Sequence, residues 1–133
     1  MTRRGVDAAL GARRYDDRPG AVVHEAFSFV DGAYSLGLFG DVATEMCLVL
    51  DGDEGLFASY SDVQFTAPVR AGDVLEITAT LVREGTRSRV MDFAVHVVGR
   101  GAPTAEAPGA ATVLDPPIVA TTATGTVVVP PRS

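Results

Sequence analysis

The sequence predicts a two-layer α+β fold in which an antiparallel sheet wraps around one long central helix. Two observations support this prediction: one long apolar segment with helical periodicity, and several later segments in which apolar and polar residues alternate as in strands. The length of 133 residues fits one domain, over 1–133, and is sufficient for a hydrophobic core that needs no metal or disulfide.

The helix is predicted over 32–50, with Asp31 as its N-cap because that carboxylate can accept hydrogen bonds from the first turn. One apolar stripe is predicted to face the core, and it comprises Leu36, Phe39, Ala43, Met46, Cys47 and Leu50. The opposite side carries Leu38, Leu48 and Val49. Because both sides are apolar, we expect a second surface to cover the helix, and another subunit could supply it.

Four segments after the helix have strand patterns, at 56–65, 73–83, 89–98 and 118–129. Residues 67–73 form the predicted turn between the first two strands, and 84–86 a hairpin between the next two. The stretch 99–117 is rich in Ala, Pro and Gly and is predicted to be a surface loop. The four strands are expected to form an antiparallel meander, and a short edge strand can be accommodated within residues 1–20.

The charge balance and the residue types that are missing exclude several classes of function. Acidic residues outnumber basic ones 17 to 11, for a net charge of −6, so no nucleic-acid partner is expected. All basic residues are arginine, which excludes Schiff-base and P-loop lysine chemistry. Cys47 is the single cysteine and only His24 and His96 accompany it, so we expect no disulfide and no metal site. We interpret Cys47 and His96 as structural residues.

The sequence shows neither a secretory leader nor an apolar run of about 18 residues. We therefore expect a cytoplasmic protein that does not span a membrane.

Long sequence motifs around the predicted helix carry a specific resemblance. They are Val30-Asp31-Gly32-Ala33, Leu38-Phe39-Gly40-Asp41-Val42-Ala43-Thr44-Glu45 and Asp51-Gly52-Asp53-Glu54-Gly55-Leu56-Phe57, followed by Phe65-Thr66-Ala67-Pro68-Val69, Ala71-Gly72-Asp73, and Ser88-Arg89 with Met91 and Phe93. In these motifs, from about His24 to the C-terminus, the chain resembles the 3-aminobutyryl-CoA ammonia-lyase family and the related β-alanyl-CoA ammonia-lyases. Residues 1–20 do not match convincingly. The resemblance implies a single hot-dog domain that reversibly eliminates ammonia from a short β-aminoacyl-CoA to give the 2-enoyl-CoA.

Two departures from the family pattern leave the acyl group open. His24-Glu25-Ala26-Phe27 stands where the family has His-Tyr-Gly-Gly, and Gly85-Thr86-Arg87-Ser88-Arg89 stands where it favours Gly-Asn-Thr-Ser-Arg. Both segments lie where a substrate could be recognised. The substrate is therefore expected to be a short β-aminoacyl group, carried on CoA or on a carrier protein.

The candidate catalytic residues are Asp41, Glu45 and His24. Asp41 and Glu45 are four residues apart and share one helix face, beside Leu38 and Leu48. From the residues alone a solvated outer face is the commoner outcome, although an apolar intersubunit surface could raise the pKa of a carboxyl group there. The resemblance favours Asp41 as the base that removes the α-proton, with Glu45 and His24 assisting.

The helix start and three arginines are the candidate binding groups. Backbone N–H groups at Asp31, Gly32 and Ala33 could stabilise the enolate oxygen, although an ordinary capped helix start has the same pattern. Arginines are candidates for the CoA phosphates because guanidinium groups bind phosphate through paired hydrogen bonds. Arg89 matches the family pattern, Arg87 does not, and Arg70 could simply be solvated.

No metal or redox cofactor is expected, because the thioester itself activates the α-proton. Two other functions stay open: a thioesterase, in which the helix carboxylate activates water or attacks the carbonyl, and a non-catalytic subunit that binds acyl thioesters. A single unit has too few walls to enclose a CoA thioester. We therefore expect a homodimer or a higher homo-oligomer with the site at the subunit boundary.

Overall fold

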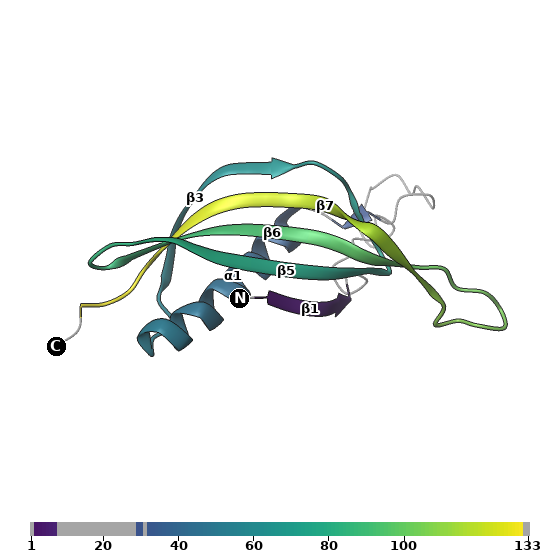
Figure 1. The fold of residues 1–133 in the computed structure, drawn as a ribbon, viewed down its shortest axis with the longest axis horizontal. Coiled ribbons are helices and arrows are strands. Elements are labelled where there is room, and N and C mark those ends of the chain that lie inside the picture. The colour runs from purple at the N-terminus through teal and green to yellow at the C-terminus, as the bar shows by residue number, and fades with distance from the viewer. Residues whose placement is uncertain (1, 8–28, 31, 132–133) are drawn as a thin grey trace, which may run out of the picture.

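The computed structural model describes residues 2–7, 29–30 and 32–131, so the predicted site residues His24 and Asp31 lie outside the described part. One layer is a five-stranded antiparallel sheet, and the other is the helix α1 (Gly32–Asp51), which lies against one face of that sheet (Figure 1). The predicted α+β arrangement is confirmed.

The sheet has the strand order β1 (Thr2–Asp7), β5 (Asp73–Glu84), β6 (Ser88–Gly101), β7 (Ala111–Val128) and β3 (Leu56–Phe65). β5, β6 and β7 form the expected meander, and β1 is the short edge strand. The prediction was wrong for β3, which pairs with β7 at the far edge and not with β5. The chain passes from β3 to β5 through the short β4 (Val69–Arg70), which pairs with β2 (Phe29–Val30).

The predicted surface loop at 99–117 is much shorter in the structure. β6 continues to Gly101 and β7 starts at Ala111, so only residues 102–110 connect them. The proline-rich composition misled the prediction because Pro116 and Pro117 fall inside a register shift, between the paired residues Ile118 and Val113. Proline lacks an N–H group and is tolerated at such an irregularity, where the ladder does not require one.

α1 ends one residue later than predicted, and four residues of the predicted stripe, Phe39, Ala43, Met46 and Cys47, are buried against the sheet as expected. Its buried side chains are Ser35, Leu38, Phe39, Val42, Ala43, Met46 and Cys47. The predicted stripe was wrong for Leu38, which is buried, and for Leu50, which is 42% exposed, while Leu36 is only partly buried. Because both sides of the helix carry apolar residues, its periodicity did not determine which side faces the sheet.

The core between helix and sheet is aromatic at its centre. Phe39 stacks on Phe93 with ring centroids 5.0 Å apart, and a Cβ placed on Gly125 would lie 2.5 Å from the Phe57 ring. Gly125 is therefore the position that lets the aromatic rings lie against β7.

By length and composition α1 could span a membrane, which corrects the expectation that no segment could. Here its seven buried side chains make it the core helix.

Candidate functional site

Cavities lie at the two ends of α1. The helix-start cavity has a volume of about 350 Å³ and is lined by Val30, Gly32, Ser35, Phe65, Thr66, Ala67, Pro68, Val69 and Thr121. The helix-end cavity has a volume of about 710 Å³ and is lined by Asp51, Gly52, Asp53, Thr86, Arg87, Arg89, Val129, Pro130 and Pro131. The side chains of the first are apolar except for hydroxyl groups, whereas the second carries charged side chains.

A β-bulge builds one wall of the helix-start cavity. Ala120 is an extra residue in β7 between Thr121, which pairs with Val95, and Val119, which pairs with His96. Its carbonyl accepts hydrogen bonds from the backbone N–H groups of Thr66 and Ala67, at 2.8 and 3.2 Å. The Thr66 hydroxyl also donates to the Val119 carbonyl at 2.8 Å. The bulge therefore anchors the segment after β3 that forms the wall.

A buried ion pair fixes the turn that follows this wall. Arg100 donates to both carboxylate oxygens of the fully buried Asp73, from Nε at 2.8 Å and from Nη2 at 3.2 Å. Asp73 also accepts from the backbone N–H of Arg70 at 2.8 Å, which closes the turn between β4 and β5. The hydrogen bond that Arg100 donates to Asp73 raises the pKa of Arg100. We assign Asp73 and Arg100 to positioning this turn.

Gly32 lets an aromatic ring close over the start of the helix. A Cβ on Gly32 would lie 2.6 Å from Cε1 of Phe65, so only glycine fits beneath the ring in its present position. Phe65 itself is 59% exposed at the end of the edge strand β3. The first N–H groups of any helix have no acceptor within the helix, and the helix dipole favours an anion there. The cavity mouth therefore suits a developing negative oxygen.

The predicted acids lie away from this cavity. Asp41 and Glu45 are exposed on the outer face of α1, and neither lines the helix-start cavity. Asp41 follows Gly32 by nine residues, which is about 14 Å along the helix axis. None of the described residues that line the cavity is ionisable. The described part of the chain therefore places a helix start beside this cavity but no ionisable side chain in its lining.

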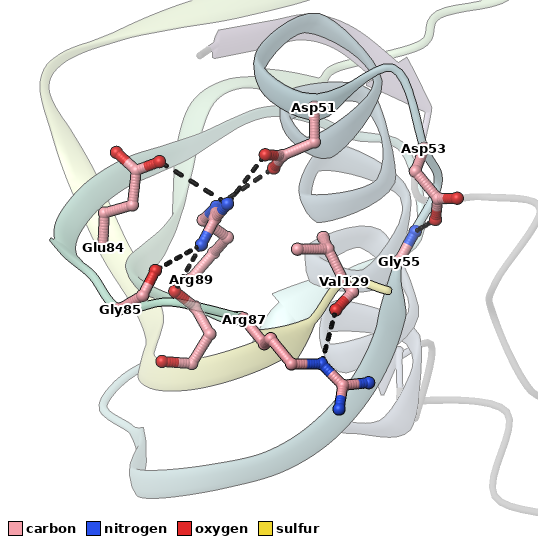
Figure 2. A network of polar contacts seen from close by, with 9 residues as sticks. Asp51, Asp53, Gly55, Glu84, Gly85, Arg87, Arg89 and Val129 are labelled. Carbon is pink, nitrogen blue, oxygen red and sulfur yellow. Dashed lines mark hydrogen bonds and ion pairs between the residues drawn. The ribbon is translucent and has the colours of Figure 1, made fainter. Parts of the chain in front are cut away.

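Arg89 lies in a buried network at the other end of the helix (Figure 2). Its Nε and Nη2 donate to the two carboxylate oxygens of Asp51 at 3.0 and 2.8 Å, and its Nη1 donates to the carbonyls of Gly85 and Ser88 at 2.8 and 2.9 Å. Glu84 lies 3.5 Å from Nη2. The Arg89 and Asp51 side chains are only 7% and 4% exposed.

This network occupies the side chain of Arg89, which was predicted to bind a CoA phosphate. All the guanidinium nitrogens are already engaged by protein oxygens, so a phosphate could bind only by breaking a buried ion pair. The hydrogen bond with Asp51 raises the pKa of Arg89. Asp51 puts a carboxylate at the negative end of the helix dipole, and Arg89 supplies the offsetting cation. An acid followed by the helix-ending Gly52 was the sequence signal for this partner, and we missed it.

Arg87 is better placed than Arg89 for a ligand. It lines the helix-end cavity, its residue is exposed, and its Nε donates to the Val129 carbonyl at 3.3 Å. Figure 2 shows its guanidinium directed away from the Arg89–Asp51 pair. Arg70 is exposed and lines neither cavity. A phosphate-binding role for Arg87 therefore stays a prediction with a suitable location.

Two residues interpreted as structural are fully or partly buried. Cys47 is fully buried, and burial raises the pKa of its thiol. His96 is partly buried on β6, and its Nδ1 has no hydrogen-bond partner within the described residues. In the same part of the chain, no three His, Cys, Asp or Glu side chains gather as metal ligands would.

Comparison with known proteins identifies the family of this chain. Residues 27–103 match the model of the thioesterase superfamily. The 3-aminobutyryl-CoA ammonia lyase of Acetoanaerobium sticklandii is 47% identical over 109 residues, which cover 80% of this chain and 84% of that protein.

Solved structures agree on the fold. The β-alanyl-CoA:ammonia lyase from Clostridium propionicum superposes with a TM-score of 0.78 at 28% identity, covering 100% of this chain and 90% of that one. A hexameric thioesterase from Yersinia pestis has a TM-score of 0.65 at 17% identity, covering 100% and 92% of the two chains, and shows the fold alone.

Proposed function

Since the chain belongs to the thioesterase superfamily and, within it, to the 3-aminobutyryl-CoA ammonia lyase family, we propose that it reversibly eliminates ammonia from a short β-aminoacyl-CoA. The observation that carries the proposal is the 47% identity over most of both chains. The helix-start cavity supports it with the part that such a reaction needs first, a helix N-terminus beside a small apolar pocket.

The elimination has three movements of charge. A carboxylate base takes the proton from C2 of the acyl chain, and the electron pair of that C–H bond delocalises into the thioester as an enolate. The N–H groups at the start of α1 stabilise the enolate oxygen. The electron pair then forms the C2–C3 double bond while the C3–N bond breaks, and the ammonium substituent leaves as ammonia. The proton held by the carboxyl group is transferred to ammonia or to water.

We assign the base to Asp41 of a second copy of the chain, with Glu45 and His24 assisting. Two helices that cross antiparallel at Gly37 place Asp41, four residues after the crossing, opposite Ala33 of the partner, four residues before it. Residues at the start of one helix would then receive the carboxylate that their own chain places about 14 Å away. A Cβ on Gly37 or Gly40 would meet nothing of its own protomer within 4 Å, so these positions leave room for a partner backbone.

The outer face of α1 supports this assembly. Leu48 and Val49 are 50% and 74% exposed on a helix whose other face is core. Exposed apolar side chains on a helix are typical of a surface that another chain covers. We therefore propose a homodimer or a larger homo-oligomer, as in the hexameric relative, with each site shared between two copies.

The remaining parts of the proposal concern CoA and the cell. Arg87 at the helix-end cavity would bind a CoA phosphate. No metal or redox cofactor would be needed, because the thioester carbonyl acidifies the C2 proton. Neither a membrane nor a nucleic acid is a proposed partner, and we propose that the enzyme works in the cytoplasm.

The decisive experiment incubates the purified protein with crotonyl-CoA and ammonia. Formation of 3-aminobutyryl-CoA, followed by mass spectrometry, is the expected result. Release of free CoA would show that the protein is a thioesterase and would contradict the lyase assignment. Binding of CoA with neither product would leave a non-catalytic acyl-thioester subunit.

Mixing two variants with impaired activity tests whether the site is shared. Asp41→Asn removes the proposed base, and Gly32→Val fills the mouth of the helix-start cavity. If each site combines Gly32 of one copy with Asp41 of another, co-refolding the two variants restores activity, because one site of each mixed pair is intact. A site confined to one protomer would give no recovery, since every chain carries a defect.

A further inference from the structure

Two buried hydroxyl groups lie at the base of the helix-start cavity, among apolar walls. Ser35 comes from the first turns of α1 and Thr121 from β7, next to the bulge at Ala120. Both line the cavity and each is only 2% exposed. They are the buried polar side chains of this cavity, because Thr66, its other hydroxyl residue, is exposed.

The two hydroxyls satisfy each other poorly. The Thr121 hydroxyl donates to Ser35 Oγ at 3.4 Å, whereas hydroxyl hydrogen bonds are usually about 2.7 to 2.8 Å long. Each hydroxyl offers one donor and two acceptor positions, and this contact uses only one donor and one acceptor of the pair. Buried polar groups are normally hydrogen-bonded, and within the described residues this contact is the hydrogen bond of both side chains, so the pair has capacity left for a polar group that enters the cavity.

We propose that the Ser35 and Thr121 hydroxyls form the subsite for the amino group of the substrate, and so select β-aminoacyl thioesters over plain acyl thioesters. The inference rests on the proposed function, which places the thioester oxygen at the start of the same helix. A nitrogen about 2.9 Å from both oxygens fits between atoms that are 3.4 Å apart. The subsite would thus take one small polar group and no more.

Hydroxyl groups suit both states of the nitrogen. The ammonium substituent donates N–H groups, which the hydroxyl lone pairs accept. After the C3–N bond breaks, neutral ammonia has a lone pair, and a hydroxyl can turn to donate to it. A carboxylate in this place could only accept, and it would hold the ammonium too firmly to favour departure.

The test compares the ammonia dependence of Thr121→Val, Ser35→Ala and wild type during addition of ammonia to crotonyl-CoA. Valine keeps the shape of threonine without the hydroxyl, and Thr121→Ser keeps the hydroxyl with less bulk. We expect kcat/KM for ammonia to fall roughly 10- to 100-fold in Thr121→Val and Ser35→Ala. The KM for crotonyl-CoA should change by less than about twofold, and Thr121→Ser should retain most of the wild-type value.

Thr122→Val is the matched control, because Thr122 is the next residue of β7 and does not line the helix-start cavity. It should behave as wild type. If wild type adds ammonia and the hydroxyl-free variants do so equally well, the subsite is wrong while the lyase assignment stands. An equal rise in KM for crotonyl-CoA would also overturn the subsite, because the hydroxyls would then serve the acyl chain. If wild type adds no ammonia, both proposals fail. Should Thr121→Val not fold, Ser35→Ala and Thr121→Ser decide the question.

Discussion

The two ends of α1 solve different physical problems. At the helix end, Asp51 and Arg89 form a buried bidentate ion pair with almost no exposed surface, and Gly52 closes the helix with a backbone hydrogen bond to Leu48 at 3.0 Å. At the helix start, the described walls are apolar with two weakly paired hydroxyls, and Phe65 covers Gly32. At the helix end the charged groups are fully paired with one another. At the helix start the two hydroxyls are only weakly paired, so they can bind a ligand.

The largest expected effect comes from the carboxylate between these two ends. Asp41→Asn should lower kcat for ammonia elimination by about 10² to 10⁴, the usual contribution of a general base. The midpoint of thermal unfolding should stay close to that of wild type, because asparagine keeps the size of aspartate and Asp41 is not part of the buried core. Glu54→Gln, in the exposed turn after the helix, is the control. Normal kinetics in Asp41→Asn would contradict the assignment of the base.

The next effect is on stability, at the helix end. Arg89→Met should lower the free energy of unfolding by about 3 to 5 kcal/mol, because it leaves the Asp51 carboxylate buried without its partner. Urea unfolding measures the loss, and the folded fraction should keep its kcat. Arg83→Met, at an exposed position of β5, is the matched control. If Arg89→Met is as stable as wild type but has a raised KM for CoA thioesters, Arg89 binds the substrate.

Gly32→Val tests the helix start by adding a side chain to it. The new side chain would displace the Phe65 ring and occupy the cavity mouth, so we expect kcat/KM for the thioester to fall by at least about 10-fold. Unfolding free energy should change little, since Phe65 is largely exposed and its ring can move. Gly109→Val, at an open position of the loop after β6, is the control. A strong loss of stability with unchanged kinetics would make Gly32 a packing residue only.

The smallest effect concerns the helix-end cavity. Arg87→Gln should raise the KM for CoA thioesters several-fold, and the difference from wild type should shrink at high salt, because exposed charge pairs contribute about 1 kcal/mol or less. Stability should not change, and Arg83→Gln provides the comparison. An unchanged KM at low salt would remove Arg87 from the binding site.

Local patterns predicted most of the fold. Strands 56–65 and 73–83 and the long helix were placed within one residue of their observed limits, because alternation and helical periodicity report directly on burial. Strand pairing was harder to predict from the sequence. β3 pairs with β7, and no local pattern within β3 indicates which strand is its neighbour. The side of the helix that faces the sheet was also undetermined, since Leu38 and Leu36 lie on different sides and both are apolar.

The candidate site divides in the same way. The resemblance selected the helix start and the two helix acids as candidates, and it also offered Arg89 as a phosphate ligand. The hydrogen bonds between Arg89 and Asp51 are visible only in the three-dimensional structure. Ser35 and Thr121 were not selected because serine and threonine are common everywhere. Their meaning comes from burial beside a cavity, which joins residues that are 86 positions apart.

The complete burial of Cys47 has a consequence for the lifetime of the enzyme. A 2-enoyl thioester is an electrophile that alkylates accessible thiols and amines, so an enzyme that makes or consumes one risks inactivating itself. This chain contains no lysine, and its single cysteine is fully buried with a raised thiol pKa. Burial keeps that thiol protonated and out of reach, so the folded chain has no lysine and no exposed cysteine side chain for its own product to modify.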